Sequence, residues 1–261
     1  MTRGSRCRAG CMFGHQSRAD HWHSEQSGRM HLMLAVALAL LLALLWAGGA
    51  WWQRRAQDAV LLRTEPAQLL RSPVLVRYAV SRGEPVYRHS CAGCHGAQRR
   101  GDARRGVPAL ASHNWLYGDD LVGVEHIVLY GIRSGHPQAR NLTDMPALVR
   151  TGQITDQDAR DAVEYLLQLS GRTHDAAAAE RGRAIYLGKG NCYDCHASDA
   201  AGVIDYGTPP LTGPEWLYGG DRDTLLQSIA NGRHGKCPAH TRTLSPAQAR
   251  AVAVYLVTAR H

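Results

Sequence analysis

Two pentapeptides of the same form, CAGCH at residues 91–95 and CYDCH at residues 192–196, decide the fold of this chain. Each has two cysteines separated by two residues, with a histidine directly after the second cysteine. The pattern recurs at an offset of 101 residues, within a chain of 261 residues. A motif that returns at a fixed offset indicates a duplicated domain.

The residues after each pentapeptide also repeat. Pro108 and Leu110 return as Pro209 and Leu211, and WLYG at 115–118 returns at 216–219. Further on the offset becomes smaller. There MPA at 145–147 aligns with CPA at 237–239, and DARDAVEYL at 158–166 aligns with QARAVAVYL at 248–256. We therefore predict two domains of one fold, residues 81–171 and 175–261, each of ordinary domain size.

The pattern predicts an all-α fold for both copies. A helix precedes each cysteine pair, and the second of these is expected to begin after Asp175, a residue suited to the N-cap position. A helix closes each copy. Thr155 and Ser245 start sequences that resemble capping boxes, so the closing helices are expected to begin there. Nothing in the chain reads as a substantial sheet.

Cys-x-x-Cys-His is the attachment pattern of c-type haem. The two thiols bind the haem covalently, and the adjacent histidine reaches the iron. We predict two covalently bound haem c groups, because the pattern occurs twice. Zinc would need a set of four ligands that neither copy supplies. The predicted attachment residues are Cys91, Cys94, Cys192 and Cys195, with His95 and His196 as iron ligands.

An uncharged stretch precedes the repeats. Residues 32–52 contain no charged side chain, and three tryptophans lie toward its end. This length crosses a bilayer. We predict a transmembrane helix over residues 31–53, a cytoplasmic tail over 1–30 and a connecting segment over 54–80; a cleaved signal peptide is the alternative. Met30 as the true start stays open, and Cys7 and Cys11 read as reduced thiols of the tail.

Two such domains after one membrane helix, with WLYG in both, resemble the dihaem subunit III of cbb3-type cytochrome c oxidases. The resemblance implies an electron-transfer subunit without its own catalytic centre. Electrons would pass from a soluble cytochrome or a quinol-oxidising complex to the haem–copper core. It also implies a single-pass protein of the inner membrane with its haem domains on the periplasmic side, since c-type haem is attached outside the cytoplasm.

The loops after the cysteines match class I cytochromes c. That resemblance implies that the carbonyl groups of Pro108 and Pro209 accept the N–H of the axial histidines. Leu110 and Leu211 would pack on the haem. Trp115 and Trp216 are expected either to donate to a haem propionate or to belong to the core.

The family's usual histidine–methionine pairing implies His95 with Met145, and His196 with the residue at position 237. Met145 is the only methionine beyond the apolar stretch, and cysteine occupies position 237. We expect the Cys237 thiolate at the second iron. His240, His234, Lys236 or an open site are the alternatives. A neutral thioether raises the potential, so this pairing makes the first haem the higher-potential centre.

Two other functions fit the same residues. One is a free-standing membrane-anchored carrier for another reductase or dehydrogenase, and the other is a haem sensor or peroxidase-like enzyme with a displaceable ligand.

The net charge of +8 does not indicate that the chain binds nucleic acid, because the basic residues are scattered among acidic ones.

Overall fold

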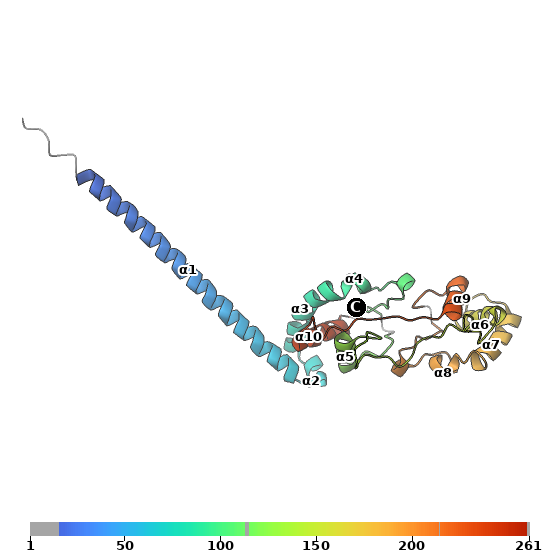
Figure 1. Ribbon diagram of the computed structural model, residues 1–261. Coiled ribbons are helices and arrows are strands. Elements are labelled where there is room, and N and C mark those ends of the chain that lie inside the picture. Colours follow the sequence, from blue (N-terminus) through green and yellow to red (C-terminus); the bar gives the residue numbers. More distant parts are fainter. Residues whose placement is uncertain (1–15, 113–114, 214, 260–261) are drawn as a thin grey trace, which may run out of the picture. The chain divides into compact units, whose positions relative to one another are not determined.

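A computed structural model describes residues 16–112, 115–213 and 215–259 of the chain. The chain divides into two units, residues 1–58 and 59–261, and each is described by itself. Helices make up the regular structure, and β pairing within the described residues is confined to isolated bridges (Figure 1). The all-α prediction is confirmed. The α-helices are α1 (Gln16–Arg63), α2 (Pro66–Arg71), α3 (Pro73–Ser90), α4 (Ala92–His95), α5 (Leu121–Tyr130), α6 (Asp156–Leu169), α7 (Ala176–Leu187), α8 (Tyr193–His196), α9 (Arg222–Asn231) and α10 (Pro246–Thr258); short 3₁₀ turns occupy Ala103–Arg105 and Ile204–Tyr206.

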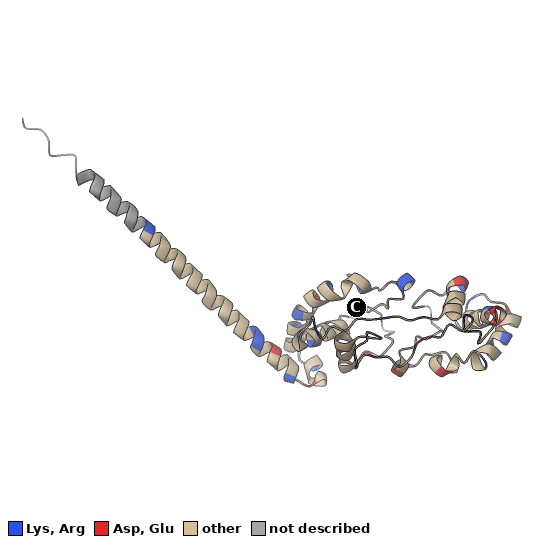
Figure 2. Cartoon of the chain, viewed as in Figure 1, with Lys and Arg blue, Asp and Glu red and all other residues tan. Residues whose placement is uncertain are grey.

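Helix α1 carries the apolar stretch. Between Arg29 and Arg54 it has no Lys, Arg, Asp or Glu, and it appears as an unbroken tan ribbon in Figure 2. By length and composition this helix can cross a membrane, because an 18-residue window within Arg29–Arg63 has a mean hydropathy of 2.4. It extends beyond the predicted 31–53 on both sides and ends at Arg63, shortly before Pro66. The residue before a proline is disfavoured in helical conformation, which explains this end.

The capping predictions are confirmed. Thr155 and Ser245 each accept a hydrogen bond from the backbone N–H three residues on, and the side chains of Asp158 and Gln248 accept bonds in return. Asp175 caps α7 by accepting from the backbone N–H of Ala178 at 2.9 Å. These bonds satisfy N–H groups that the first helical turn leaves without partners. The start of each helix is therefore determined locally.

The closing helix of each repeat packs against the other repeat. Helix α10 lies against α3 and α5, and α6 lies against α7 and α9 (Figure 1). Two separate cores result. We call them the first core, formed by α3, α5 and α10, and the second core, formed by α6, α7 and α9. The sequence predicted instead that each of these helices would close its own copy.

The short connection between α6 and α7 accounts for part of this exchange. Helix α6 ends at Leu169 and α7 begins at Ala176, so a few residues join them. Helices joined by such a short loop pack as antiparallel neighbours. Once α6 lies on α7, the remaining partner for α3 is α10.

One glycine lies at each helix crossing. A Cβ atom on Gly182 would lie 2.0 Å from the carbonyl oxygen of Asp161, and one on Gly83 would lie 2.2 Å from that of Ala251. Asp161 and Ala251 occupy aligned positions in the two closing helices. The same close backbone contact therefore occurs in both cores, each time between different repeats.

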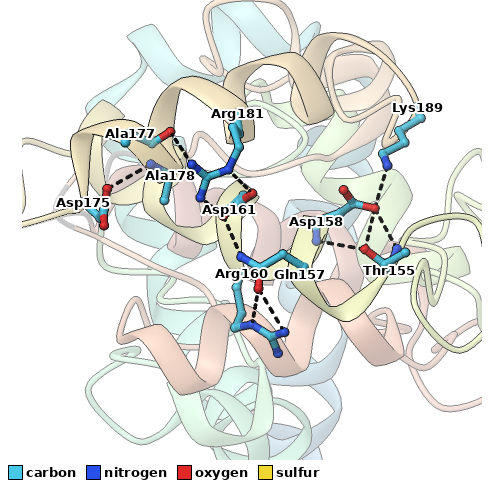
Figure 3. Close-up of polar contacts among 10 residues, drawn as sticks. All are labelled: Thr155, Gln157, Asp158, Arg160, Asp161, Asp175, Ala177, Ala178, Arg181 and Lys189. Carbon is cyan, nitrogen blue, oxygen red and sulfur yellow. Dashed lines mark hydrogen bonds and ion pairs between the residues drawn. The ribbon is translucent and has the colours of Figure 1, made fainter.

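Ion pairs join α6 to the second repeat (Figure 3). The buried Asp161 carboxylate accepts from Arg181 at 2.7 Å, and Asp158 pairs with Lys189, also at 2.7 Å. Hydrogen bonds, first from Lys189 and then from Thr155, lower the pKa of Asp158 to about 2. These contacts hold the middle of α6 on α7 and the start of α6 on the loop that follows α7.

A third ion pair shows that the facing side chains are complementary in the exchanged arrangement of the helices. Glu164 of α6 accepts from Arg222 of α9 at 2.8 Å. The aligned residues in the other pair of helices are Val254 and Leu121, and both are buried in the first core. Packing within each repeat would instead set Glu164 against Leu121 and Val254 against Arg222. At these two positions, charge faces charge and apolar faces apolar only when the helices are exchanged.

This complementarity predicts a charge-swap result. Glu164→Arg and Arg222→Glu should each lower the denaturant midpoint of unfolding, because each places like charges together. The double variant should recover most of the loss. The Arg222 side chain is half exposed, so the effect should shrink as salt is added. Circular dichroism during urea unfolding measures it. If the double variant lost as much stability as the two single variants together, this would contradict the contact between Glu164 and Arg222.

Candidate functional site

Each cysteine motif forms one short helix, α4 in the first repeat and α8 in the second. The backbone N–H of His95 donates to the carbonyl of Cys91 at 3.0 Å, and that of His196 donates to Cys192 at the same distance. Such a turn brings residues three and four apart onto one face, so both thiols and the histidine share it. The described cysteines form no disulfide.

A proline carbonyl fixes each histidine. Nδ1 of His95 lies 3.0 Å from the carbonyl oxygen of Pro108, and Nδ1 of His196 lies 3.0 Å from that of Pro209. A carbonyl can only accept, so Nδ1 carries the hydrogen and Nε2 keeps its lone pair for a metal. Burial lowers the pKa of both histidines, which keeps the rings neutral. The two hydrogen bonds expected from the sequence are present.

Both motifs line one cavity of about 720 Å³ in the unit formed by residues 59–261. Its walls include His95, His196 and their attachment cysteines. Leu110 and Trp115 pack on the first core, whereas Leu211 and Trp216 pack on the second. Nε1 of Trp216 is buried without a hydrogen-bond partner among the described residues, so it is a donor that a carboxylate of a bound group would satisfy. The residues present fit covalently attached haem.

No cluster of three His, Cys, Asp or Glu side chains able to hold a metal ion occurs among the described residues. Cys7, Cys11 and His15 of the predicted tail lie outside the described residues.

Met145 lies with the second repeat. It packs on the second core, as do Cys192, Leu211 and Trp216. The backbone N–H of Met145 donates to the carbonyl of Arg233 at 3.3 Å. This placement differs from the pairing with His95 that the sequence suggested.

Cys237 lies with the first repeat. Its backbone N–H donates to the carbonyl of Ile132 at 2.9 Å. Burial, and after it the nearby Cys94, raise the pKa of its thiol to about 11. The pKa of Cys91 is also raised to about 11, first by burial and then by Cys237. Such mutual effects need proximity, so Cys237 is near the first attachment pair rather than the second.

The residues that were alternatives to Cys237 as an iron ligand differ in whether they line the cavity. His240 and Lys236 line the cavity, and burial lowers the pKa of His240. His234 is half exposed, and its Nδ1 lies 3.4 Å from the carboxylate of Asp144.

The sequence did not indicate that the tyrosines of the two WLYG segments would line the cavity. A Cβ on Gly207 would lie 2.0 Å from Cζ of Tyr117, and one on Gly106 would lie 2.0 Å from Cε1 of Tyr218. Each tyrosine thus packs on a glycine of the opposite repeat, and all four residues line the cavity. The recurrence of Tyr and Gly at the same offset was the available signal. It gave no indication that the contact crosses between repeats.

Neutral histidines held beside paired free thiols are what covalent haem attachment requires, so fold and sites together place the chain among the c-type cytochromes. Residues 80–170 match the family described as cytochrome c. Residues 177–256 match the family described as cytochrome c oxidase, cbb3-type, subunit III.

Similar proteins narrow the class further. The cbb3-type cytochrome c oxidase subunit CcoP of Cereibacter sphaeroides is 36% identical over 196 residues, which cover 75% of this chain and 66% of the relative. CcoP of Azospirillum brasilense is 34% identical over 78% of this chain and 70% of that protein. FixP of Bradyrhizobium sp. strain ORS 278 is 34% identical over 94% of this chain and 76% of the relative. The chain therefore belongs to the CcoP/FixP family of cbb3-type oxidase subunits.

Proposed function

We propose that this chain is a membrane-anchored dihaem subunit that passes electrons to the catalytic subunits of a cbb3-type oxidase. The observation that carries the proposal is the duplicated site, in which each motif has its histidine fixed by a proline carbonyl on the wall of one cavity. Relatives at 34–36% identity are named subunits of that oxidase.

The chain's own residues have distinct tasks in this proposal. The four attachment cysteines would hold the cofactor, and His95 and His196 would offer Nε2 to its iron. Haem c, when bound, supplies reversible one-electron chemistry. The apolar walls around Leu110 and Leu211 keep water out, which limits reorganisation during electron transfer and tunes the potential.

The first prediction is a haem count of two per chain. Each motif has a complete set of thiols and a histidine, so both should be loaded. A pyridine haemochrome assay on the purified protein measures the ratio. Cys91→Ser with Cys94→Ser should remove one haem, and Cys192→Ser with Cys195→Ser should remove the other. A native ratio of one or none would refute the dihaem proposal.

The second prediction concerns topology. The haem domains should lie on the periplasmic side, anchored by α1, because haem c is attached outside the cytoplasm. Protease added to intact spheroplasts should therefore release the haem-containing part, whereas a cytoplasmic marker stays intact. Full protection of the haem domains would contradict this orientation.

Purification from the native membrane tests the partner. Oxidase subunits should copurify with this chain, and reduced haem in the complex should be reoxidised by oxygen. A chain that purifies alone, or with another reductase or dehydrogenase, would favour the free-standing carrier. Carbon monoxide binding to the isolated reduced chain would favour the sensor.

A further inference from the structure

We infer that Arg133 is a positioning residue for both sixth-ligand loops: its guanidinium ties the loop that leads to Met145 to the loop that leads to Cys237. The sixth-ligand loops are residues 141–145 and 233–237. This inference rests on the proposed function, because it requires haem at both motifs. It makes the two haems depend on one side chain.

Two backbone carbonyl groups accept hydrogen bonds from this guanidinium. Nε of Arg133 donates to the carbonyl oxygen of Gly235 at 2.5 Å, and Nη1 donates to that of Thr143 at 2.7 Å. Gly235 lies two residues before Cys237, and Thr143 lies two residues before Met145. The two loops are therefore held at aligned positions, close to their sulfur-bearing residues.

Asp144 adds an ion pair to this tether. Its carboxylate lies 3.3 Å from Nε of Arg133, and its other oxygen lies 3.4 Å from Nδ1 of His234. The Asp144 side chain is 48% exposed, whereas that of Arg133 is 19% exposed. Exposed ion pairs are weak, and hydrogen bonds from a charged donor strengthen as water is excluded. The two carbonyl contacts therefore carry most of the tether.

The backbone that carries this guanidinium is fixed on both sides. The backbone N–H of Arg133 donates to the carbonyl of Arg140 at 2.9 Å, and the preceding residue, Ile132, forms an antiparallel bridge with Cys237. The φ angle of Arg133 is +48°, a region that residues other than glycine rarely adopt. Such strain persists where surrounding contacts over-determine the backbone. The guanidinium thus extends from a fixed point.

The duplication does not provide a second tether of this kind. The residue aligned with Arg133 in the second repeat is His234, and an imidazole has no guanidinium fork. The neighbouring Arg233 is used within its own repeat. Its Nε donates to Oγ of Ser228 at 2.9 Å, and its guanidinium lies over the ring of Tyr218. One arginine, contributed by the first repeat, therefore serves both loops.

The tether lies beside the space for the bound group. Arg133, Thr143 and Gly235 all line the cavity that contains both motifs. A sulfur ligand competes for its iron with small molecules in solution, and a loop that is already held in place favours the sulfur. A loop that is set free loses this advantage. Because one guanidinium holds both loops, movement of one loop should weaken the hold on the other.

Substitution of Arg133 tests the tether in the intact chain. Arg133→Gln removes the guanidinium. Arg133→Lys keeps the charge, but its ammonium group lacks the planar fork that reaches two carbonyls. In both variants, the affinity of each oxidised haem for added imidazole should rise about tenfold, the factor expected from losing one charge-assisted hydrogen bond. Electron paramagnetic resonance follows the titration, because haems with different sixth ligands give separate signals.

Two control variants separate the tether from charge and from the ion pair. Arg100→Gln removes an exposed positive charge and should leave both affinities at their native values. Asp144→Asn removes the ion pair but keeps both carbonyl contacts, so its effect should be well below that of Arg133→Gln. The reduction potentials of both haems should shift in Arg133→Gln and stay unchanged in Arg100→Gln. A role confined to general stability would lower the unfolding midpoint without these changes at the irons.

The native chain offers a test that needs no variant. Displacement of one sulfur ligand by imidazole should release the guanidinium and raise the affinity of the other haem, so binding should be cooperative. Independent binding at the two haems would overturn the inference. Native affinities in Arg133→Gln, a change at only one haem, or full rescue by Arg133→Lys would overturn it as well, while a haem count of two left the proposed function standing. Fewer than two haems per native chain would remove the proposed function and the inference together.

Discussion

Gly182→Ala is expected to destabilise the folded chain by about 3 kcal/mol, the upper part of the usual cost of overpacking. The new Cβ would lie 2.0 Å from the Asp161 carbonyl oxygen, and this atom belongs to a helix backbone that cannot rotate away. Inside a helix the same substitution ordinarily stabilises by about 1 kcal/mol. A loss of stability would therefore show that steric contact with α6 outweighs helix propensity.

Guanidinium unfolding, followed by far-ultraviolet circular dichroism, measures this change. Gly83→Ala should behave in the same way through Ala251. Gly213→Ala is the matched control, since its nearest non-neighbouring atom would lie 4.0 Å from the new Cβ. A Gly182→Ala chain as stable as the control would contradict the helix crossing.

The second large effect concerns reduction potentials. Met145→His should lower the potential of the higher-potential haem by on the order of 0.1 V, within the ~0.8 V range that axial ligands span. Thioether favours ferrous iron more than imidazole does. Cys237→Met should raise the potential of the other haem, because it replaces an anionic ligand by a neutral one.

Spectroelectrochemical titration resolves the two haems. Met33→Leu is the control, because Met33 lies in the apolar stretch of α1 and should leave both potentials unchanged. Unchanged potentials in the Met145 variant would exclude this methionine as a ligand.

Local physics explains what the sequence predicted well. The caps at Thr155, Asp175 and Ser245 depend on residues within one helical turn, so a short sequence determines them. The proline–histidine hydrogen bonds join residues only thirteen positions apart, and resemblance to a known loop was enough to anticipate them.

The exchange of helices could not be predicted in this way. Because α6 and α10 descend from one repeated pattern, their apolar faces suit either partner, and hydrophobic periodicity does not distinguish them. The difference lies in a few substitutions, such as Glu164 where the other copy has Val254. Whether such a substitution stabilises the packing depends on which residue faces it, Arg222 or Leu121. Only the three-dimensional structure shows which of the two it is.

The exchange also has a consequence for biogenesis. In the proposed orientation the chain is exported with its first motif well ahead of α10, yet α10 completes the core around that motif. Cys91 and Cys94 therefore stay accessible to the attachment machinery until the end of translocation. The second motif, by contrast, meets α6 as soon as it emerges, since α6 has already been exported. Haem attachment and folding should thus be completed last at the first motif. A chain shortened at its C-terminus should therefore be defective at Cys91 and Cys94, although these residues lie far from the truncation in the sequence.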